Sequence, residues 1–225
     1  ISESMRSQIN GLNQASANAK DAIGLIKTAE GALSEVHSML QRMTTLAEQA
    51  ANGTYNTVAR GNIQEEYKAL TKEIKRISEN ADFNGIKPLT TGKEMTMTFQ
   101  IGPTSGETIT VDKEDIYGKT VTAAMSLKLS VQNDAKNALK TIKTAIDDVS
   151  TYRAKLGAAQ NRLEHTVKSL DIMSENITEA ESRIRDTDMA DEITAFTKNN
   201  ILLQAAQSML AQSNAAPQGI LSLLQ

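Results

Sequence analysis

Two histidines, His37 and His165, are the side chains best suited to acid–base or metal chemistry, because histidine titrates close to neutral pH and binds divalent metals. Neither has a second histidine three or four residues away, and the sequence contains no cysteine. The His-Glu-x-x-His, Gly-x-Ser-x-Gly and glycine-rich phosphate-loop motifs are also absent from the sequence. We therefore expect no enzymatic activity, no metal site and no cofactor, and interpret both histidines as positions on helix surfaces or seams.

The charges exclude further classes of partner. The chain has 24 basic and 27 acidic residues, which are interspersed, and a net charge of −3. It therefore offers no basic stripe for a phosphate backbone, and we expect no nucleic-acid partner. No apolar run approaches the roughly 18 residues that a membrane span needs, so we expect no membrane insertion.

Apolar residues recur every seven positions between residues 138 and 184, which indicates a long helix that packs along one seam. One row comprises Ile142, Val149, Leu156, Leu163, Leu170, Ile177 and Ile184, and the companion row comprises Ala138, Ala145, Tyr152, Ala159, Thr166, Met173 and Ala180. We predict a helix over about residues 122–185. About 55 such residues extend roughly 80 Å at 1.5 Å per residue, so this seam needs partners of comparable length.

Other segments supply those partners. A second heptad seam from Met5 to Ala50 predicts a helix over about residues 1–52, and an amphipathic pattern predicts a shorter, antiparallel helix over residues 58–80. Between residues 81 and 121, alternating polar and apolar residues from Met95 to Ile101 and from Thr108 to Val111 predict a small β-hairpin. The fold class is therefore mainly α, an elongated antiparallel helical rod of coiled-coil-like helices with a β-hairpin region.

A last helical segment follows Arg185, with Asp186 or Asp188 as its expected N-cap, and Pro217 is expected to end the regular helix. Its apolar residues have no evident partner within the chain, which indicates a binding surface. They are Met189, Ile193, Phe196, Ile201, Leu202, Leu203, Ala206, Met209 and Leu210, followed by Ile220, Leu221, Leu223 and Leu224 in the tail.

Four strings carry a resemblance to a known family. They are residues 5–51, Phe83-Asn84-Gly85, residues 153–165 (RAKLGAAQNRLEH) and residues 181–225 (from ESRIRDTDMADE to QSNAAPQGILSLLQ). Together they closely resemble bacterial flagellin. The family begins with a further helical segment that is absent here, so we expect the chain to be truncated at the N-terminus. The resemblance implies a rod domain over residues 1–185 and a C-terminal terminal-domain helix over residues 186–225.

The resemblance also implies function and partners. Similar proteins are structural subunits of the extracellular flagellar filament, which serves motility, and they assemble with other flagellin subunits. They leave the cell by type III export with a chaperone on the segment that corresponds to residues 186–225, and they meet the filament cap and junction proteins. A hook–filament junction adaptor is the alternative. A flagellin carrying a protease would need a zinc motif that this sequence lacks, and a generic coiled-coil scaffold would explain the seams but not the strings.

Some flagellins are sensed by a Toll-like receptor through the first two rod helices. The residues of this chain that match the receptor motif are Gln41, Arg42, Leu46, Gln49, Ile63 and Glu66. Thr44 and Glu48 depart from the arginine and the apolar residue that are usual there. The resemblance therefore implies a receptor contact with an altered motif, whereas the residues alone indicate solvated helix charges at Arg42 and Glu66.

Overall fold

A computed structural model of the chain describes residues 1–90, 96–113, 118, 123, 127–186 and 189–223, with the backbone alone for residues 215–223. Its described elements, in chain order, are α1 (Ser2–Ala51), α2 (Thr57–Asn80), β1 (Thr96–Gln100), β2 (Thr108–Asp112), α4 (Gln132–Arg185) and α5 (Met189–Leu223). The predicted mainly helical fold with one small hairpin is confirmed.

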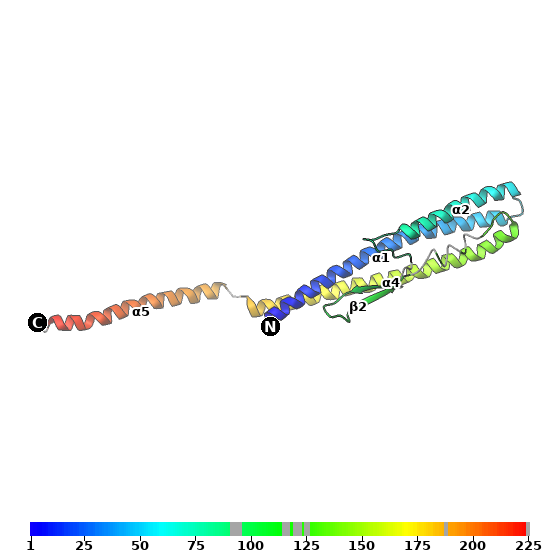
Figure 1. Cartoon of the computed structure of the whole chain (residues 1–225). Helices are drawn as coiled ribbons and strands as arrows, with labels where there is room; N and C mark the ends of the chain where they lie inside the picture. Colours follow the sequence, from blue (N-terminus) through cyan, green and yellow to red (C-terminus); the bar gives the residue numbers. More distant parts are fainter. Residues whose placement is uncertain (91–95, 114–117, 119–122, 124–126, 187–188, 224–225) are drawn as a thin grey trace.

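Helices α1 and α4 lie antiparallel along most of their length and form the rod (Figure 1). At one end Ser2 of α1 donates to Glu181 of α4, and at the other end Gln132 of α4 donates to the carbonyl oxygen of Ala51. Helix α2 returns antiparallel beside α1 at this second end. We call this second end, where the α1–α2 loop meets the start of α4, the rod tip.

Heptad residues bury the seam for most of its length. In α4 the row from Ile142 to Leu170 is buried, and Leu33, Leu40 and Ala47 of α1 face it in the main core. Beyond Leu170 the residues of this α4 row are no longer buried: Ile177 is half-buried and Ile184 is exposed. A small separate core of Leu12, Ala15 and Leu170 ends the packing there, because only two helices remain to cover each other.

Strands β1 and β2 pair antiparallel, with Met97 opposite Val111 and Phe99 opposite Ile109. Met97, Ile109 and Val111 are buried and the intervening threonines are exposed, so the predicted alternation is confirmed for the described residues. Met95, which we placed in the first strand, lies outside the described residues. The hairpin packs its apolar face on α1 and α4.

Local signals mark several boundaries. The side chain of Asn56 accepts a hydrogen bond of 2.8 Å from the amide of Ala59 and caps the start of α2. The pair Asn84-Gly85, both with positive φ (53° and 84°), forms the tight turn that joins the Phe83 and Ile86 backbones.

The predicted start of the third long helix is wrong by about ten residues. Residues 127–131 are not helical and α4 begins at Gln132, while residue 122 itself lies outside the described residues. Leu129 is fully buried, and its amide donates to the side-chain oxygen of Gln64 in α2. A buried side chain and a satisfied amide therefore stabilise this segment against helix formation.

The predicted end of the last helix at Pro217 is also wrong, because α5 continues to Leu223. A proline inside a helix removes one intrahelical hydrogen bond, and α5 keeps its regular backbone on both sides of that loss. Of the two expected N-caps of α5, Asp188 lies outside the described residues. Asp186 instead ends α4: its amide donates to the Ser182 carbonyl and its carboxylate accepts from the Ser182 hydroxyl over 2.5 Å.

Candidate assembly interface

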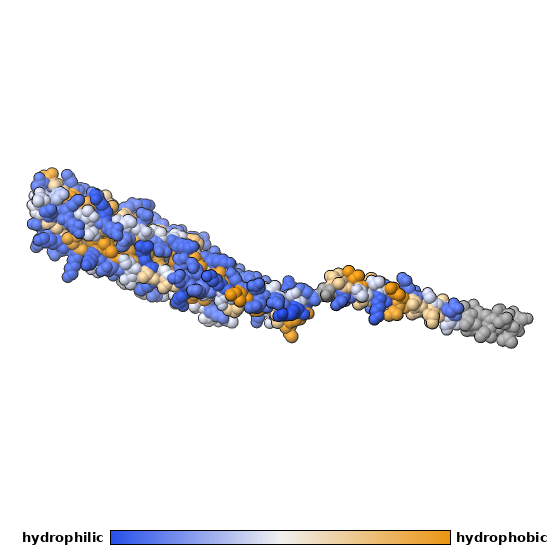
Figure 2. Space-filling model, turned by 180° about the vertical axis from the view of Figure 1, so that it is seen from behind, coloured by the Kyte–Doolittle hydropathy of each residue, from blue (hydrophilic) through white to orange (hydrophobic). Residues whose placement is uncertain are grey.

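Helix α5 projects from the rod at the end where the N-terminus lies (Figure 1). Its described residues contact no other element of the described chain, and every side chain described in it is exposed. Phe196 is 65% exposed and Met209 71% exposed. Figure 2 shows apolar residues along α5 on the side in view. The apolar residues that we predicted to form a binding surface and that are exposed here are Met189, Ile193, Phe196, Ile201, Leu202, Leu203, Ala206, Met209 and Leu210.

The apolar residues of α5 are spread around the helix. Ile201, Leu202 and Leu203 are consecutive, and each step turns the side chain by about 100°. Such a helix exposes apolar area in every direction, which is usual for a helix enclosed by partners on several sides. Of the tail residues that we predicted to bind, Ile220, Leu221 and Leu223 lie where only the backbone is described, and Leu224 lies outside the described residues.

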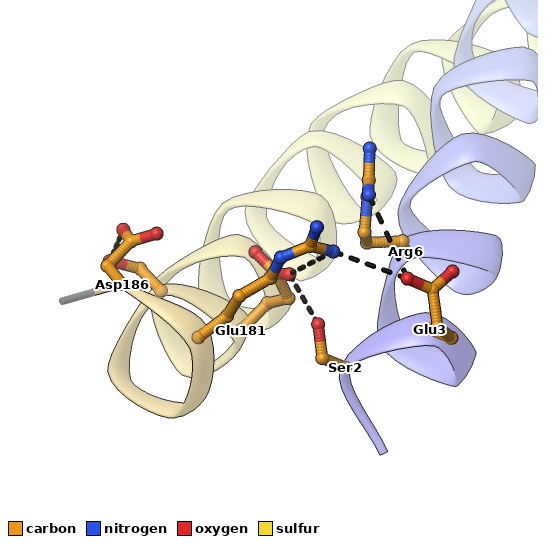
Figure 3. Close-up of polar contacts among 7 residues, drawn as sticks. Ser2, Glu3, Arg6, Glu181 and Asp186 are labelled. Carbon is orange, nitrogen blue, oxygen red and sulfur yellow. Dashed lines mark hydrogen bonds and ion pairs between the residues drawn. The ribbon is translucent and has the colours of Figure 1, made fainter.

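Polar residues link the ends of α1 and α4 immediately before α5. Ser2 donates to Glu181 over 2.6 Å, and Arg185 lies 3.3 Å from Glu3 and 3.9 Å from Glu181. Arg6 lies 3.9 Å from the same Glu3 carboxylate, so the two helix ends share one network of charges (Figure 3). We name Ser2, Glu3, Arg6, Glu181 and Arg185 the junction cluster. The network is largely exposed, so it aligns the two helix ends more than it stabilises them.

The residues that match the receptor motif lie in α1 and α2 near the rod tip. Arg42 bonds Glu66 across the two helices, with Nη2 and Nε at 2.7 and 2.8 Å from Oε1. Leu46 and Ile63 are buried in the main core. Of the six residues, Gln41, Arg42 and Glu66 are exposed and Gln49 is half-buried. Leu46 and Ile63 can therefore only support a contact made by the others.

Side chains suited to chemistry are dispersed. His37 is half-buried and bonds Gln41 over 2.9 Å, and His165 is exposed on α4. Within the described parts of the chain, no group of three or more histidine or acidic side chains is placed to hold a metal ion. The resolved pKa shifts of acidic groups come from local pairs: hydrogen bonds from Lys68 and Arg76 lower the pKa values of Glu65 and Glu73.

Some surface features escaped sequence reasoning. The junction cluster joins residues near the two ends of the first 185 positions, and an apolar groove beside it combines α1, the hairpin turn and α4. Neither has a local sequence signal, because each needs elements that are far apart along the chain. Lys136, Lys140 and Lys143 of α4 do have a local sequence signal, because spacings of four and three residues place them on one helix face.

An elongated helical rod followed by an exposed apolar helix is typical of a protein that assembles through its helices. The family description "bacterial flagellin N-terminal helical region" matches residues 1–94, and "bacterial flagellin C-terminal helical region" matches residues 139–224. The chain is 47% identical over 225 residues to the flagellin of Halalkalibacterium halodurans, covering all of this chain and 82% of the relative. The chain belongs to the bacterial flagellin family.

Solved structures agree with this assignment. The crystal structure of Bacillus cereus flagellin matches with a TM-score of 0.63 and 32% identity, over 68% of this chain and 88% of that one. A protein described as a flagellar hook-associated protein from Vibrio parahaemolyticus matches with a TM-score of 0.67 over 81% of this chain and 95% of that one. Its 12% identity shows a shared fold alone.

The chain is thus a structural subunit of the extracellular flagellar filament, assembles with other flagellin subunits, and is not an enzyme. Among the helices that the structure describes, none has the length and apolarity to cross a membrane.

Proposed function

We infer that residues 186–225 form a separate terminal unit, which a flagellar export chaperone covers before the subunit joins the filament. The observation that carries this proposal is the exposure of α5: each apolar side chain described in it faces solvent. An apolar helix of this kind promotes aggregation when it is left uncovered in the cell. A chaperone that encloses it provides the burial that the described part of the chain does not.

The proposed division places the rod domain at residues 1–185. The rod has its own core, which runs from Leu163 to the rod tip, and its packing ends before α5 begins. Asp186 closes α4 through Ser182, so the proposed boundary coincides with a hydrogen-bonded helix end. Removing residues 186–225 should therefore leave the rod folded.

Chaperone binding can be tested with two matched double variants. In the full-length chain, Leu203→Glu with Met209→Glu places two charges on apolar positions of α5. Gln204→Glu with Gln207→Glu adds the same charge to exposed polar positions of that helix. Burying a leucine is worth about 1.5–3 kcal/mol. We expect the first variant to lose at least about tenfold in affinity for the export chaperone, measured by calorimetry, and the second to bind normally.

Equal affinity of both variants for the export chaperone would refute the proposal. Circular dichroism of the rod serves as the control for folding, and it should be the same for both variants. The proposal extends to the filament cap and junction proteins, which we expect to meet the same terminal unit after export. A role as a hook–filament junction adaptor has no observation in its favour beyond the shared fold.

A second proposal concerns recognition by a Toll-like receptor. The observation that favours it is the Arg42–Glu66 pair, which presents charge on the joint surface of α1 and α2. We expect Arg42→Ala to weaken binding to the receptor ectodomain, while Arg76→Ala on the same rod leaves it unchanged. Unaltered affinity of the Arg42 variant, measured by surface plasmon resonance, would remove the proposal.

A further inference from the structure

The sequence contains three Asn-Gly pairs, which are Asn10-Gly11, Asn52-Gly53 and Asn84-Gly85. In such a pair the main-chain nitrogen of glycine can attack the side-chain carbonyl carbon of asparagine, because glycine has no Cβ to obstruct the cyclic imide that forms. All three asparagines are exposed, so water reaches each of them. The pairs differ instead in how the backbone holds the reacting groups.

Two of the pairs are held against ring closure, which requires the peptide between asparagine and glycine to rotate. Gly11 lies inside α1, where its amide is bonded one turn back along the helix, so the helix must open first. Asn84 has a φ of 53°, and rotating the peptide that follows would move it into backbone conformations that glycine alone adopts readily. The Gly85 amide also donates to the Asp82 carboxylate over 3.1 Å. Both pairs should therefore react slowly.

The third pair lies in the α1–α2 loop and is differently placed. Asn52 has an extended backbone (φ −76°, ψ 134°), from which the next peptide rotates without a positive φ. Among the described residues, the Gly53 amide donates no hydrogen bond. The side-chain oxygen of Asn52 accepts a hydrogen bond from the amide of Thr54 over 3.2 Å. This oxygen gains negative charge as the ring forms, and an N–H that already points at it stabilises that charge.

We infer that Asn52 is a site of self-modification, at which the Gly53 nitrogen converts the asparagine into aspartate and isoaspartate. This nitrogen forms a bond to Cγ of Asn52, and the Cγ–Nδ2 bond breaks. The side-chain nitrogen leaves as ammonia and takes the amide proton of Gly53. Water then opens the ring: cleavage of the new bond to Cγ gives aspartate, and cleavage of the bond to the main-chain carbon gives isoaspartate. The reaction consumes water alone and involves no oxidation or reduction.

Hydrogen bonds to the main-chain oxygen of Asn52 oppose the rotation. Arg60 donates to this oxygen from Nη2 over 3.0 Å, and the Tyr55 amide lies 3.5 Å from it. Rotation of the Arg60 side chain is enough to break the first of these bonds, and the second is long. Arg60 is therefore a positioning residue, which slows the reaction at Asn52 without touching the reacting atoms.

The products change the rod tip. Either product places a negative charge at the C-terminal end of α1, where the partial negative charge of the helix disfavours it. Isoaspartate also lengthens the main chain between Asn52 and Gly53 by one carbon atom. Gln132 of α4 donates to the carbonyl oxygen of the neighbouring Ala51, so the modified residue lies where the end of α1 meets the start of α4.

The three pairs act as controls for one another in a single experiment. The full chain is incubated at mildly alkaline pH, and conversion of each asparagine is followed by mass spectrometry of proteolytic peptides. We expect Asn52 to convert at least about tenfold faster than Asn10 and Asn84, because the opening that those two need costs at least about one hydrogen bond. Isoaspartate among the products at Asn52 is the signature of the ring. Equal rates in the folded chain, or a faster rate at Asn10 or Asn84, would overturn the proposal.

The same incubation in urea separates the fold from the local sequence. Unfolding removes the helix, the turn and the loop together, so the three rates should become similar. A preference for Asn52 that persists unchanged in urea would refute the role of the folded backbone.

Gly53→Ala tests the attacking residue. A Cβ at this position would lie 3.7 Å from Nε2 of Gln132, which is an ordinary contact, and the φ of Gly53 is not positive, so the rod tip should fold as in the parent chain. The methyl group obstructs the ring. Conversion of Asn52 should fall and isoaspartate should disappear, while Asn10 and Asn84 keep their rates. Unchanged conversion of Asn52, with unchanged helicity, would refute attack by the Gly53 nitrogen.

Arg60→Ala tests the restraint. The rate at Asn52 should rise relative to the rates at Asn10 and Asn84 in the same chain. A general loss of stability would raise all three rates, so this ratio isolates the local effect. Arg76→Ala is the matched control and should leave the ratio unchanged, because its charge pairs with a carboxylate of its own helix. A ratio that is the same in both variants would refute the role of Arg60.

Discussion

The guanidinium of Arg60, in the first turn of α2, donates from Nε to the carbonyl oxygen of Ala50 at the end of α1 over 2.8 Å. Its Nη2 also donates to the Asn52 carbonyl over 3.0 Å. Helix α1 has no basic residue in its own last turn, so its free carbonyls depend on neighbouring elements. One arginine therefore caps α1, fixes the α1–α2 loop and shapes the rod tip.

Replacing Arg60 should loosen this end of the rod. We expect Arg60→Ala to lower the free energy of unfolding by about 1–2 kcal/mol, because two carbonyl oxygens lose a charged donor. Arg60→Lys should recover part of the loss, since a lysine reaches one carbonyl but cannot span both. Urea unfolding followed by circular dichroism measures the change. Arg76→Ala is the control, because among the described residues its exposed guanidinium pairs with Glu73 on its own helix alone. An equal loss of stability in that variant would refute the capping role.

Replacing side chains along α4 by alanine should show where the core ends. Leu163 is fully buried, so Leu163→Ala should cost about 2–5 kcal/mol of unfolding free energy through lost burial and the cavity left behind. Ile172 is 59% exposed, and Ile172→Ala should cost far less. Similar urea midpoints for the two variants would contradict the packing described for this helix.

Tyr67 should make the rod sensitive to alkali. Burial raises the pKa of its phenol, because the phenolate would lose solvation inside the core. In the unfolded chain the phenol titrates near its ordinary pKa of about 10, so above that pH the unfolded state releases a proton that the folded state keeps. Stability is therefore unaffected below about pH 10 and falls as the pH rises further, by up to about 1.4 kcal/mol per pH unit.

The Tyr67→Phe variant should lose this part of the alkaline dependence. Urea midpoints measured between pH 9 and pH 11, a range set around the ordinary tyrosine pKa of about 10, supply the comparison. Tyr55→Phe is the matched control, because that side chain is exposed at the loop. A dependence that persists unchanged in the Tyr67 variant would assign the effect to other groups.

Helix α5 should be the first part of the chain to exchange its amide hydrogens. No other described element packs on it, and most of the stability of a helix in a protein comes from tertiary packing. We expect amides of Met189–Leu223 to exchange rapidly in dilute monomer and to become protected when chaperone or neighbouring subunits bind. Strong protection in dilute monomer would contradict this expectation; amides of α1 around Leu33 serve as the slow reference.

The sequence by itself determined which segments are mainly helical and which side of each rod helix is apolar. Heptad spacing from Ile142 to Leu170 identifies the buried side of α4 correctly, because neighbours three or four residues apart share a helix face wherever the helix lies. The alternation around Met97 predicted the hairpin for a similar local reason. The exposed apolar residues of α5 could also be predicted, since their excess is a property of composition.

The tertiary structure decided what depends on distant elements. Helix α4 starts at Gln132 because Leu129 is buried and its amide bonds Gln64, some 65 positions earlier in the chain. The Arg60 cap and the apolar groove between α1, the hairpin turn and α4 likewise join elements that no local pattern connects. Periodicity reports which side of a helix is apolar, but only the packed chain shows where that side stays covered and where it opens to a partner.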